Sequence, residues 1–116
     1  MLRELKEEDQ EALLALNNAS TPAVNPLSLE ELKGILSLAE KCWVEEIDRE
    51  LAAALIIIGP DQRYASDNYT WLETQFSNYC YVDRIMVTEN HKRKGLGNKL
   101  YRELEKHAER KGAHML

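Results

Sequence analysis

The sequence predicts an α/β (α+β) fold in which a mixed, mostly antiparallel central sheet is flanked by helices. Residues 41–58 have the pattern of two strands joined by a tight turn. Residues 79–111 have the pattern of a strand followed by an amphipathic helix. The chain has 116 residues, 44% of them hydrophobic, which suits one small domain spanning residues 1–116.

The chain opens with a predicted strand, helix and loop. Residues 2–6 alternate apolar and polar side chains, as a short strand does, and residues 7–17 carry apolar side chains at helical spacing. Residues 18–27 are rich in turn formers and contain two prolines, which a helix does not accommodate. We therefore expect a loop there, of a kind that often contacts ligands.

A second helix and a hairpin follow. Ser28 and Glu31 have the spacing of a capping box, and apolar residues recur at helical spacing to about Leu38. Residues 41–47 and 50–58 are predicted strands, joined by a turn at Asp48-Arg49 and ended by Gly59-Pro60. The two strands should pair antiparallel.

The second half predicts a long excursion, one strong strand and one long helix. Residues 61–77 carry aromatic side chains among polar ones, with a helical turn expected at 71–76, and long excursions are often functional. Residues 79–88 are rich in β-branched and aromatic residues. A charged connection at 89–94 leads to a helix at 95–111, which Gly112 ends as a C-cap.

Charge is unevenly distributed along the chain. The net charge is -5, which disfavours binding to nucleic acid or to an anionic membrane. Residues 89–111 nevertheless hold eight basic and four acidic residues, so this segment is positive. A local anion site on an acidic protein explains this distribution better than a polyanion-binding surface.

Neither cysteine belongs to a redox, zinc or disulfide-rich pattern, so Cys42 and Cys80 are expected to be buried, reduced thiols. The charged start of the chain is not a signal peptide, and the aliphatic run at 51–58 is too short to cross a membrane. These features predict a soluble protein of the cytoplasm.

The segment at 92–98 follows a strand, is basic and glycine-containing, and opens a helix. The first amides of a helix lack internal partners and favour negative charge, and glycines let a ligand approach the backbone closely. The segment therefore suits a phosphate. A dinucleotide fingerprint would need glycine at position 100, where Leu100 stands, and a Walker A loop would need Gly-Lys-Ser/Thr, which is absent.

These residues resemble motif A of the GNAT acetyltransferases, Arg/Gln-x-x-Gly-x-Gly/Ala after a strand ending in Val. Here it stands as Lys92-Arg93-Lys94-Gly95-Leu96-Gly97 after Val87, with Lys92 in place of the usual Arg or Gln. The run at 81–87, preceded by Asn68-Tyr69-x-Trp71, is similar to a poorly characterised bacterial branch of that family. The predicted order of elements also matches the first two-thirds of the family's domain.

The resemblance implies an acetyl-CoA-dependent N-acetyltransferase acting on an amine-bearing acceptor. Acetyl-CoA would lie across the end of the 79–88 strand, with its pantetheine beside Ile85, Met86 and Val87. Its diphosphate would meet the segment formed by Lys92, Arg93, Lys94, Gly95, Leu96, Gly97 and Asn98. A backbone amide of the strand would polarise the thioester carbonyl.

Catalytic and acceptor residues are less determined. Asp83, the nearest carboxylate on the strand, is the one candidate base, or else a structural partner of Arg84 or of a backbone amide. Four aromatic side chains either line an acceptor pocket or pack in the core: Tyr69, Trp71, Tyr79 and Tyr81. The three histidines, His91, His107 and His114, lack the spacing of a zinc site, so no metal is expected.

The resemblance also implies that a further strand begins at Gly112-Ala113-His114-Met115 just before the chain stops at Leu116, and that a later helix and terminal hairpin are absent. One edge of the 79–88 strand would then be unpaired, and a homodimer that covers it is one expectation. An engineered chain boundary, or a sequence scar in Gly-Ala-His-Met, explains the ending equally well. The alternative to an enzyme is a non-catalytic acyl-CoA-binding or protein-interaction module derived from the same fold.

Overall fold

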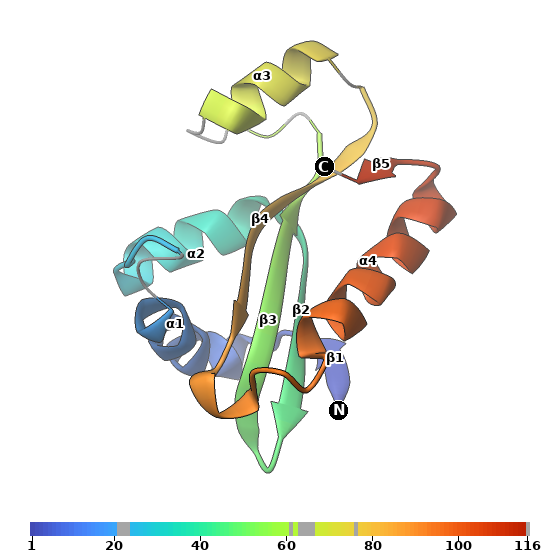
Figure 1. The fold of residues 1–116 in the computed structure, drawn as a ribbon. Helices are drawn as coiled ribbons and strands as arrows, with labels where there is room; N and C mark the ends of the chain where they lie inside the picture. The colour runs from blue at the N-terminus through green and yellow to red at the C-terminus, as the bar shows by residue number, and fades with distance from the viewer. Residues whose placement is uncertain (21–23, 61, 63–66, 76, 116) are drawn as a thin grey trace.

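One twisted sheet organises the protein. The computed structural model describes residues 1–20, 24–60, 62, 67–75 and 77–115. In this part of the chain the sheet has the strand order β1-β2-β3-β4-β5 (Figure 1). Neighbouring strands are antiparallel except β4 and β5, which are parallel. The strands are β1 (Leu2–Glu4), β2 (Ala39–Ile47), β3 (Glu50–Ile58), β4 (Tyr79–Val87) and β5 (His114–Met115).

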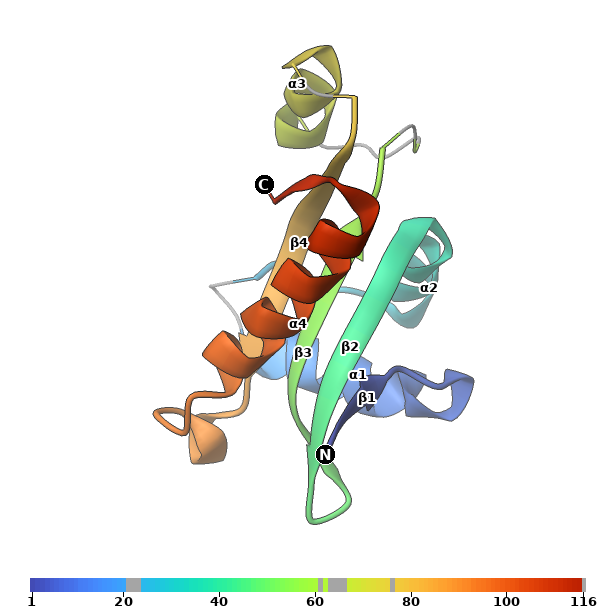
Figure 2. The ribbon, with the colours of Figure 1, turned by 90° about the vertical axis from the view of Figure 1, so that its right-hand side faces the viewer.

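Helices cover both faces of the sheet. Helices α1 (Gln10–Ala19) and α2 (Leu29–Leu38) lie on one face, and α4 (Leu96–Lys111) crosses the other, as the rotated view in Figure 2 shows. The short helix α3 (Asp67–Gln75) lies beyond the ends of β3 and β4. Two 3-10 turns, η1 (Glu7–Asp9) and η2 (Glu89–His91), precede α1 and α4.

Each face of the sheet has its own hydrophobic core. Leu100, Leu104 and Ala108 of α4 pack against Trp43 and Leu55. On the opposite face, α1 and α2 contribute Leu13, Leu16 and Leu32, which pack with Val44, Ile56 and Met86. Because strand side chains alternate between faces, the apolar run of β3 serves both cores. Burial on two sides fixes the register of the central strands.

Most predicted elements are confirmed. The hairpin pairs residues of β2 and β3 antiparallel, and the Ser28 and Glu31 capping box is present, with hydrogen bonds of 2.9 and 3.1 Å. Gly112 ends α4 in the left-handed conformation, with φ 65°. No helix in the described residues combines the length and the hydrophobicity needed to cross a membrane.

Several predicted boundaries are wrong. The helix expected from residue 7 begins as η1, because the Asp9 carboxylate accepts a hydrogen bond from the Lys6 amide and tightens this turn. Strand β2 begins at Ala39, two residues early, and α3 begins at Asp67, well before the expected turn. The predictions for Thr21-Pro22, Tyr64 and Phe76 lie outside the described residues.

Three irregularities interrupt the pairing of the described sheet. One makes Ala52 an extra residue in β3, between the pairs Glu45–Ala53 and Glu46–Leu51. Ala39 and Lys41 pair with the consecutive residues Ile58 and Ile57, so Glu40 is an extra residue in β2. Similarly, Val82 and Arg84 pair with Ile57 and Ile56, which makes Asp83 an extra residue in β4. Such β-bulges redirect side chains and are common near functional sites.

Strand β4 is only partly covered on its outer side. Strand β5 pairs with Tyr79 and Cys80 alone. Within the described part of the chain, the edge from residue 82 to 87 has no neighbouring strand on that side. The backbone groups of that edge are therefore able to bind an extended ligand.

Candidate functional site

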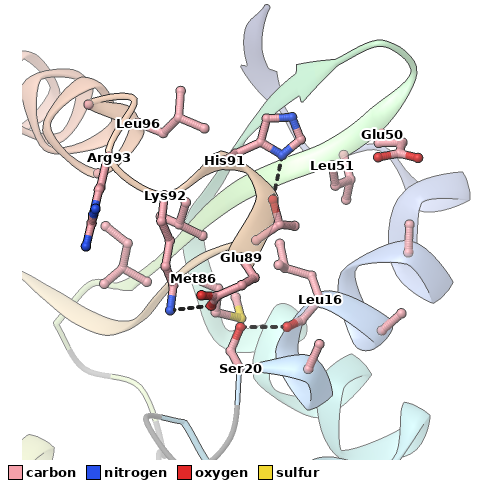
Figure 3. Close-up of a pocket in the computed structure, with 18 of the residues that line it drawn as sticks. Leu16, Ser20, Glu50, Leu51, Met86, Glu89, His91, Lys92, Arg93 and Leu96 are labelled. Atoms are coloured by element: carbon pink, nitrogen blue, oxygen red, sulfur yellow. Dashed lines mark hydrogen bonds and ion pairs between the residues drawn. The ribbon is translucent and has the colours of Figure 1, made fainter.

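A cleft of about 1190 Å³ lies between α1, the C-terminal end of β4 and the start of α4. Figure 3 shows Leu16 and Ser20 on one side and Lys92, Arg93 and Leu96 on the other. The wall from α1 is built mainly of small side chains, Ala12, Ala15 and Ala19. Short side chains on the helix leave room for a ligand above the end of the strand.

The start of α4 has the geometry of an anion site. Arg93 and Gly95 adopt positive φ angles of 69° and 74°, so the chain turns sharply before the helix begins. The Lys99 amide donates the first helical hydrogen bond, 3.0 Å long, to the Gly95 carbonyl, and the N-cap residue, Gly95, has no side chain that could cap the helix. The amides of Leu96, Gly97 and Asn98 therefore stay available at the positive end of the helix dipole.

Gly97 lines the cleft without a side chain. A Cβ atom there would make only an ordinary contact, 4.0 Å from Cδ1 of Ile85. Apart from its chain neighbours, no described atom lies within 4 Å of the Cβ position of Gly95, so its positive φ is what requires glycine there. The backbone conformation therefore requires glycine at position 95, whereas position 97 has room for a Cβ atom.

Nine of the ten predicted cofactor-binding residues line the cleft. The one that does not is Lys94, whose side chain is exposed outside it. The lining residues from the predicted set are Ile85, Met86, Val87, Lys92, Arg93, Gly95, Leu96, Gly97 and Asn98. The structure therefore brings nine of these residues together at one cleft, and their role in binding a cofactor stays a prediction.

Other lining residues were not predicted. Arg3 and Asp9 come from the start of the chain, and Arg49 and Glu50 come from the hairpin turn. Arg3 is held by Asp9, with an Nη1 to Oδ2 distance of 2.7 Å. No local pattern distinguishes these residues, because only the sheet brings β1 and the hairpin turn to the cleft.

Two of the lysines around the start of α4 are paired with carboxylates. The Lys92 ammonium lies 2.8 Å from the Glu89 carboxylate, and both side chains are exposed. The Lys99 ammonium lies 2.8 Å from the buried Glu45 carboxylate, which also accepts from the N-terminal ammonium. Because exposed pairs contribute little energy, a phosphate could replace Glu89 as the partner of Lys92.

Asp83 lies away from the cleft lining. Arg84 Nε donates a 2.6 Å hydrogen bond to the Asp83 carboxylate. The Asp83 side chain is 4% exposed and the Arg84 side chain 9%, and neither residue lines the cleft. The Arg84 guanidinium also donates to Asn17 of α1 at 2.8 Å. The geometry thus fits the structural alternative, and catalysis by Asp83 stays a prediction.

Three of the four aromatic candidates pack together. The ring of Tyr69 makes edge contacts with Tyr79 and Tyr81, at centroid distances of 6.0 and 5.7 Å. The Tyr69 hydroxyl donates to the Gly59 carbonyl at 2.6 Å, and the first two rings are buried. Trp71 is instead 58% exposed. None of the four lines the cleft.

Both cysteines are buried, free thiols, as expected. Burial raises the pKa of Cys42 to about 12. The pKa of Cys80 is also raised, first by burial and then by the negative charge of Glu40. Since the thiolate is the reactive form, neither thiol is suited to nucleophilic catalysis.

Solved structures of acetyltransferases share this fold. A ribosomal-protein-alanine N-acetyltransferase from Brucella melitensis biovar Abortus 2308 is 17% identical, with a TM-score of 0.75 over 100% of this chain and 77% of that one. An aminoglycoside antibiotic 6'-N-acetyltransferase from Acinetobacter baumannii is 18% identical, with a TM-score of 0.71 over 99% and 76%. An N-acetyltransferase from Staphylococcus aureus Mu50 is 22% identical, with a TM-score of 0.71 over 97% and 67%.

The fold is therefore that of the acetyltransferases, and helices flank its mostly antiparallel sheet as the sequence predicted. No curated protein sequence matches the chain. The model of the acetyltransferase (GNAT) family matches residues 3–116, and the chain belongs to this family. Membership in this family supports a function of the N-acetyltransferase kind, which is one kind of acyltransferase.

Proposed function

We propose that this protein is an N-acetyltransferase that uses acetyl-CoA and transfers the acetyl group to an amine of its acceptor. The observation that carries the proposal is the uncapped start of α4, where Gly95 turns the chain and the following amides face the cleft. A diphosphate would accept hydrogen bonds from the amides of Leu96, Gly97 and Asn98. Lys92 and Arg93 would add positive charge beside it.

The uncovered edge of β4 supports the rest of the proposal. The pantetheine arm carries amide groups, which would pair with the backbone of Ile85, Met86 and Val87 as an added strand does. This places the thioester farther along β4, toward the bulge at Asp83. The backbone groups that would bind the pantetheine and the diphosphate then lie in succession along β4 and the start of α4.

The transfer itself requires few side chains. The amine nitrogen attacks the thioester carbonyl, the carbon–sulfur bond breaks, and the CoA thiolate takes up a proton. A backbone amide of β4 would stabilise the developing oxyanion. The amine must also lose a proton, either to a carboxylate or to a bound water. Asp83 is the carboxylate proposed for this step.

Binding is tested by heating the protein with and without acetyl-CoA. A ligand that binds only the folded state raises the melting temperature, so we expect a concentration-dependent increase with acetyl-CoA and with CoA. Free acetate at the same concentration is the control. An unchanged melting temperature at saturating acetyl-CoA would contradict the proposed cosubstrate.

Turnover is tested separately, by release of the CoA thiol with a panel of primary amines. Acetyl-CoA binding together with thiol release that depends on the amine supports the enzyme. Binding without release from any amine supports the alternative, a non-catalytic acyl-CoA-binding module. The homodimer also stays a prediction, and sedimentation at high protein concentration tests it, since a sole monomeric species would contradict it.

A further inference from the structure

Three potential metal ligands from distant parts of the sequence meet on the face of the sheet that α4 covers. Glu40 comes from β2, Cys80 from β4 and His107 from α4. One ligand atom from each lies within 4.8 Å of the other two. His107 Nε2 and Glu40 Oε2 are 2.6 Å apart, and Cys80 Sγ lies 3.9 Å from the same oxygen. None of the three lines the cleft beside Gly95.

The backbone is shaped to place the Glu40 carboxylate in this cluster. Glu40 is the extra residue of the β2 bulge, and a bulge redirects the side chain of the strand that carries it. Gly59 provides the space, because a Cβ atom there would lie 2.4 Å from Glu40 Oε1. A regular strand, or a larger residue at position 59, would not accommodate the carboxylate in this position.

The other two side chains are held from several sides. The His107 ring packs edge-on against Trp43, at a centroid distance of 5.5 Å and an angle of 74°. The His107 side chain is 11% exposed, and Cys80 is fully buried. Glu40 is 24% exposed and borders a shallow surface hollow between β2 and the segment after β1. The cluster is therefore largely ordered but open to solvent at the carboxylate.

We propose that Glu40, Cys80 and His107 form a binding site for a divalent transition-metal ion of the zinc type. Imidazole nitrogen, thiolate sulfur and carboxylate oxygen are the three ligand types that zinc prefers. Three protein ligands would leave a fourth coordination position for a water molecule. Binding releases the Cys80 thiol proton to solvent, and His107 binds as the neutral imidazole.

A metal ion also changes the electrostatics of the cluster. Without it, burial and the Glu40 charge keep Cys80 protonated. A divalent cation reverses both effects, because it stabilises the thiolate directly. Lys111 opposes metal binding, since its ammonium contacts Glu40 Oε1 and repels a second cation. Oε2 is consequently the ligand oxygen, and Lys111 holds the other oxygen in place.

The expected consequence is structural rather than catalytic. The ion would link β2 to the start of β4 and to the C-terminal half of α4. The other ends of β4 and α4 line the cleft proposed for acetyl-CoA. Metal binding should therefore raise the melting temperature without the cosubstrate. The inference is independent of the proposed acetyl transfer.

The site is tested by titrating chelator-treated protein with Zn²⁺ in competition with a chromophoric chelator, and with Co²⁺ followed by absorption. We expect one equivalent of metal per chain and a thiolate-to-cobalt charge-transfer band. Cys80→Ser should abolish the band, and Cys80→Ser and His107→Gln should each weaken Zn²⁺ binding by about tenfold or more. Lys111→Met should strengthen it.

Matched controls are Cys42→Ser, a buried thiol packed on the other face, and His114→Gln, an exposed histidine. Both should bind metal as the wild-type protein does. Absence of the charge-transfer band in the folded wild-type protein overturns the proposal without any variant. It is also overturned if Cys80→Ser or His107→Gln, folded by circular dichroism, binds Zn²⁺ as tightly as the wild-type protein.

Discussion

Arg84 Nε donates a 2.6 Å hydrogen bond to the carboxylate of Asp83, the preceding residue of β4. Neighbouring strand residues normally face opposite sides, so this pairing depends on the bulge at Asp83. The Arg84 guanidinium also donates a hydrogen bond to Asn17 of α1. The side-chain amide of Asn17 in turn donates to the Asn25 carbonyl at 2.9 Å. This buried network joins the strand to α1 and to the segment that follows it.

Replacement of Asp83 by Asn should therefore act mainly on stability. The change leaves a nearly buried guanidinium without its anionic partner, and we expect a loss of about 2 kcal/mol in the free energy of unfolding. Denaturant unfolding measures this loss. A variant with normal stability whose activity no longer rises with pH would instead identify Asp83 as the base.

Replacement of Gly97 by Glu should weaken acetyl-CoA binding without unfolding the protein. A carboxylate in the first turn of α4 is favourable for the helix dipole but repels a diphosphate and occupies its space. We expect affinity to fall by about tenfold or more, equivalent to about 1.4 kcal/mol, measured by calorimetry. Gly34→Glu makes the same change on the exposed side of α2, away from the cleft, and should bind normally. Equal affinities for the two variants would contradict the anion site.

The two left-handed glycines allow stability and binding to be separated. Gly95 and Gly112 have φ angles of 74° and 65°, and each has open space around its Cβ position. Alanine at either position should cost about 1 to 2 kcal/mol through backbone strain alone. Only Gly95→Ala should also weaken acetyl-CoA binding, because Gly112 lies at the far end of α4. A matching loss of binding in Gly112→Ala would show that strain, rather than the loop, governs affinity.

Stability should fall in acid. Hydrogen bonds from Arg3 lower the pKa of Asp9. At Glu45 burial opposes ionisation, but hydrogen bonds from Lys99 and the N-terminal ammonium outweigh it and lower the pKa as well. A carboxylate with a lowered folded-state pKa stabilises the fold above its unfolded value, and this contribution disappears as pH falls through the folded value. We therefore expect the melting temperature to be nearly constant from pH 7 to 5 and to fall below about pH 4.

The variant Arg3→Met tests this explanation. It removes the cation that lowers the pKa of Asp9, so the melting temperature should be lower at pH 7 and should change less between pH 5 and pH 3. Lys41→Met removes the more exposed pair with Glu4 and serves as the control. Identical pH dependence of Arg3→Met and the wild-type protein would exclude Asp9 as a source of the acid sensitivity.

Features encoded over a few consecutive residues were predictable. The Ser28 and Glu31 capping box, the Gly112 C-cap and the antiparallel hairpin all appear in the structure. The loop before α4 was also predictable, because its glycines and its position between a strand and a helix act locally. The start of β2 was not, since pairing with Ile58 rather than strand propensity extends it to Ala39.

The sequence by itself determined the order of elements, the family resemblance and the loop that opens α4, since each depends on neighbours along the chain. Only the tertiary structure decided the pairing of Asp83 with Arg84 and the meeting of Glu40, Cys80 and His107. Both arrangements depend on bulges, in which one extra residue changes the direction of a side chain. A bulge is fixed by the register between strands, and that register follows from burial on both faces of the sheet rather than from any local pattern.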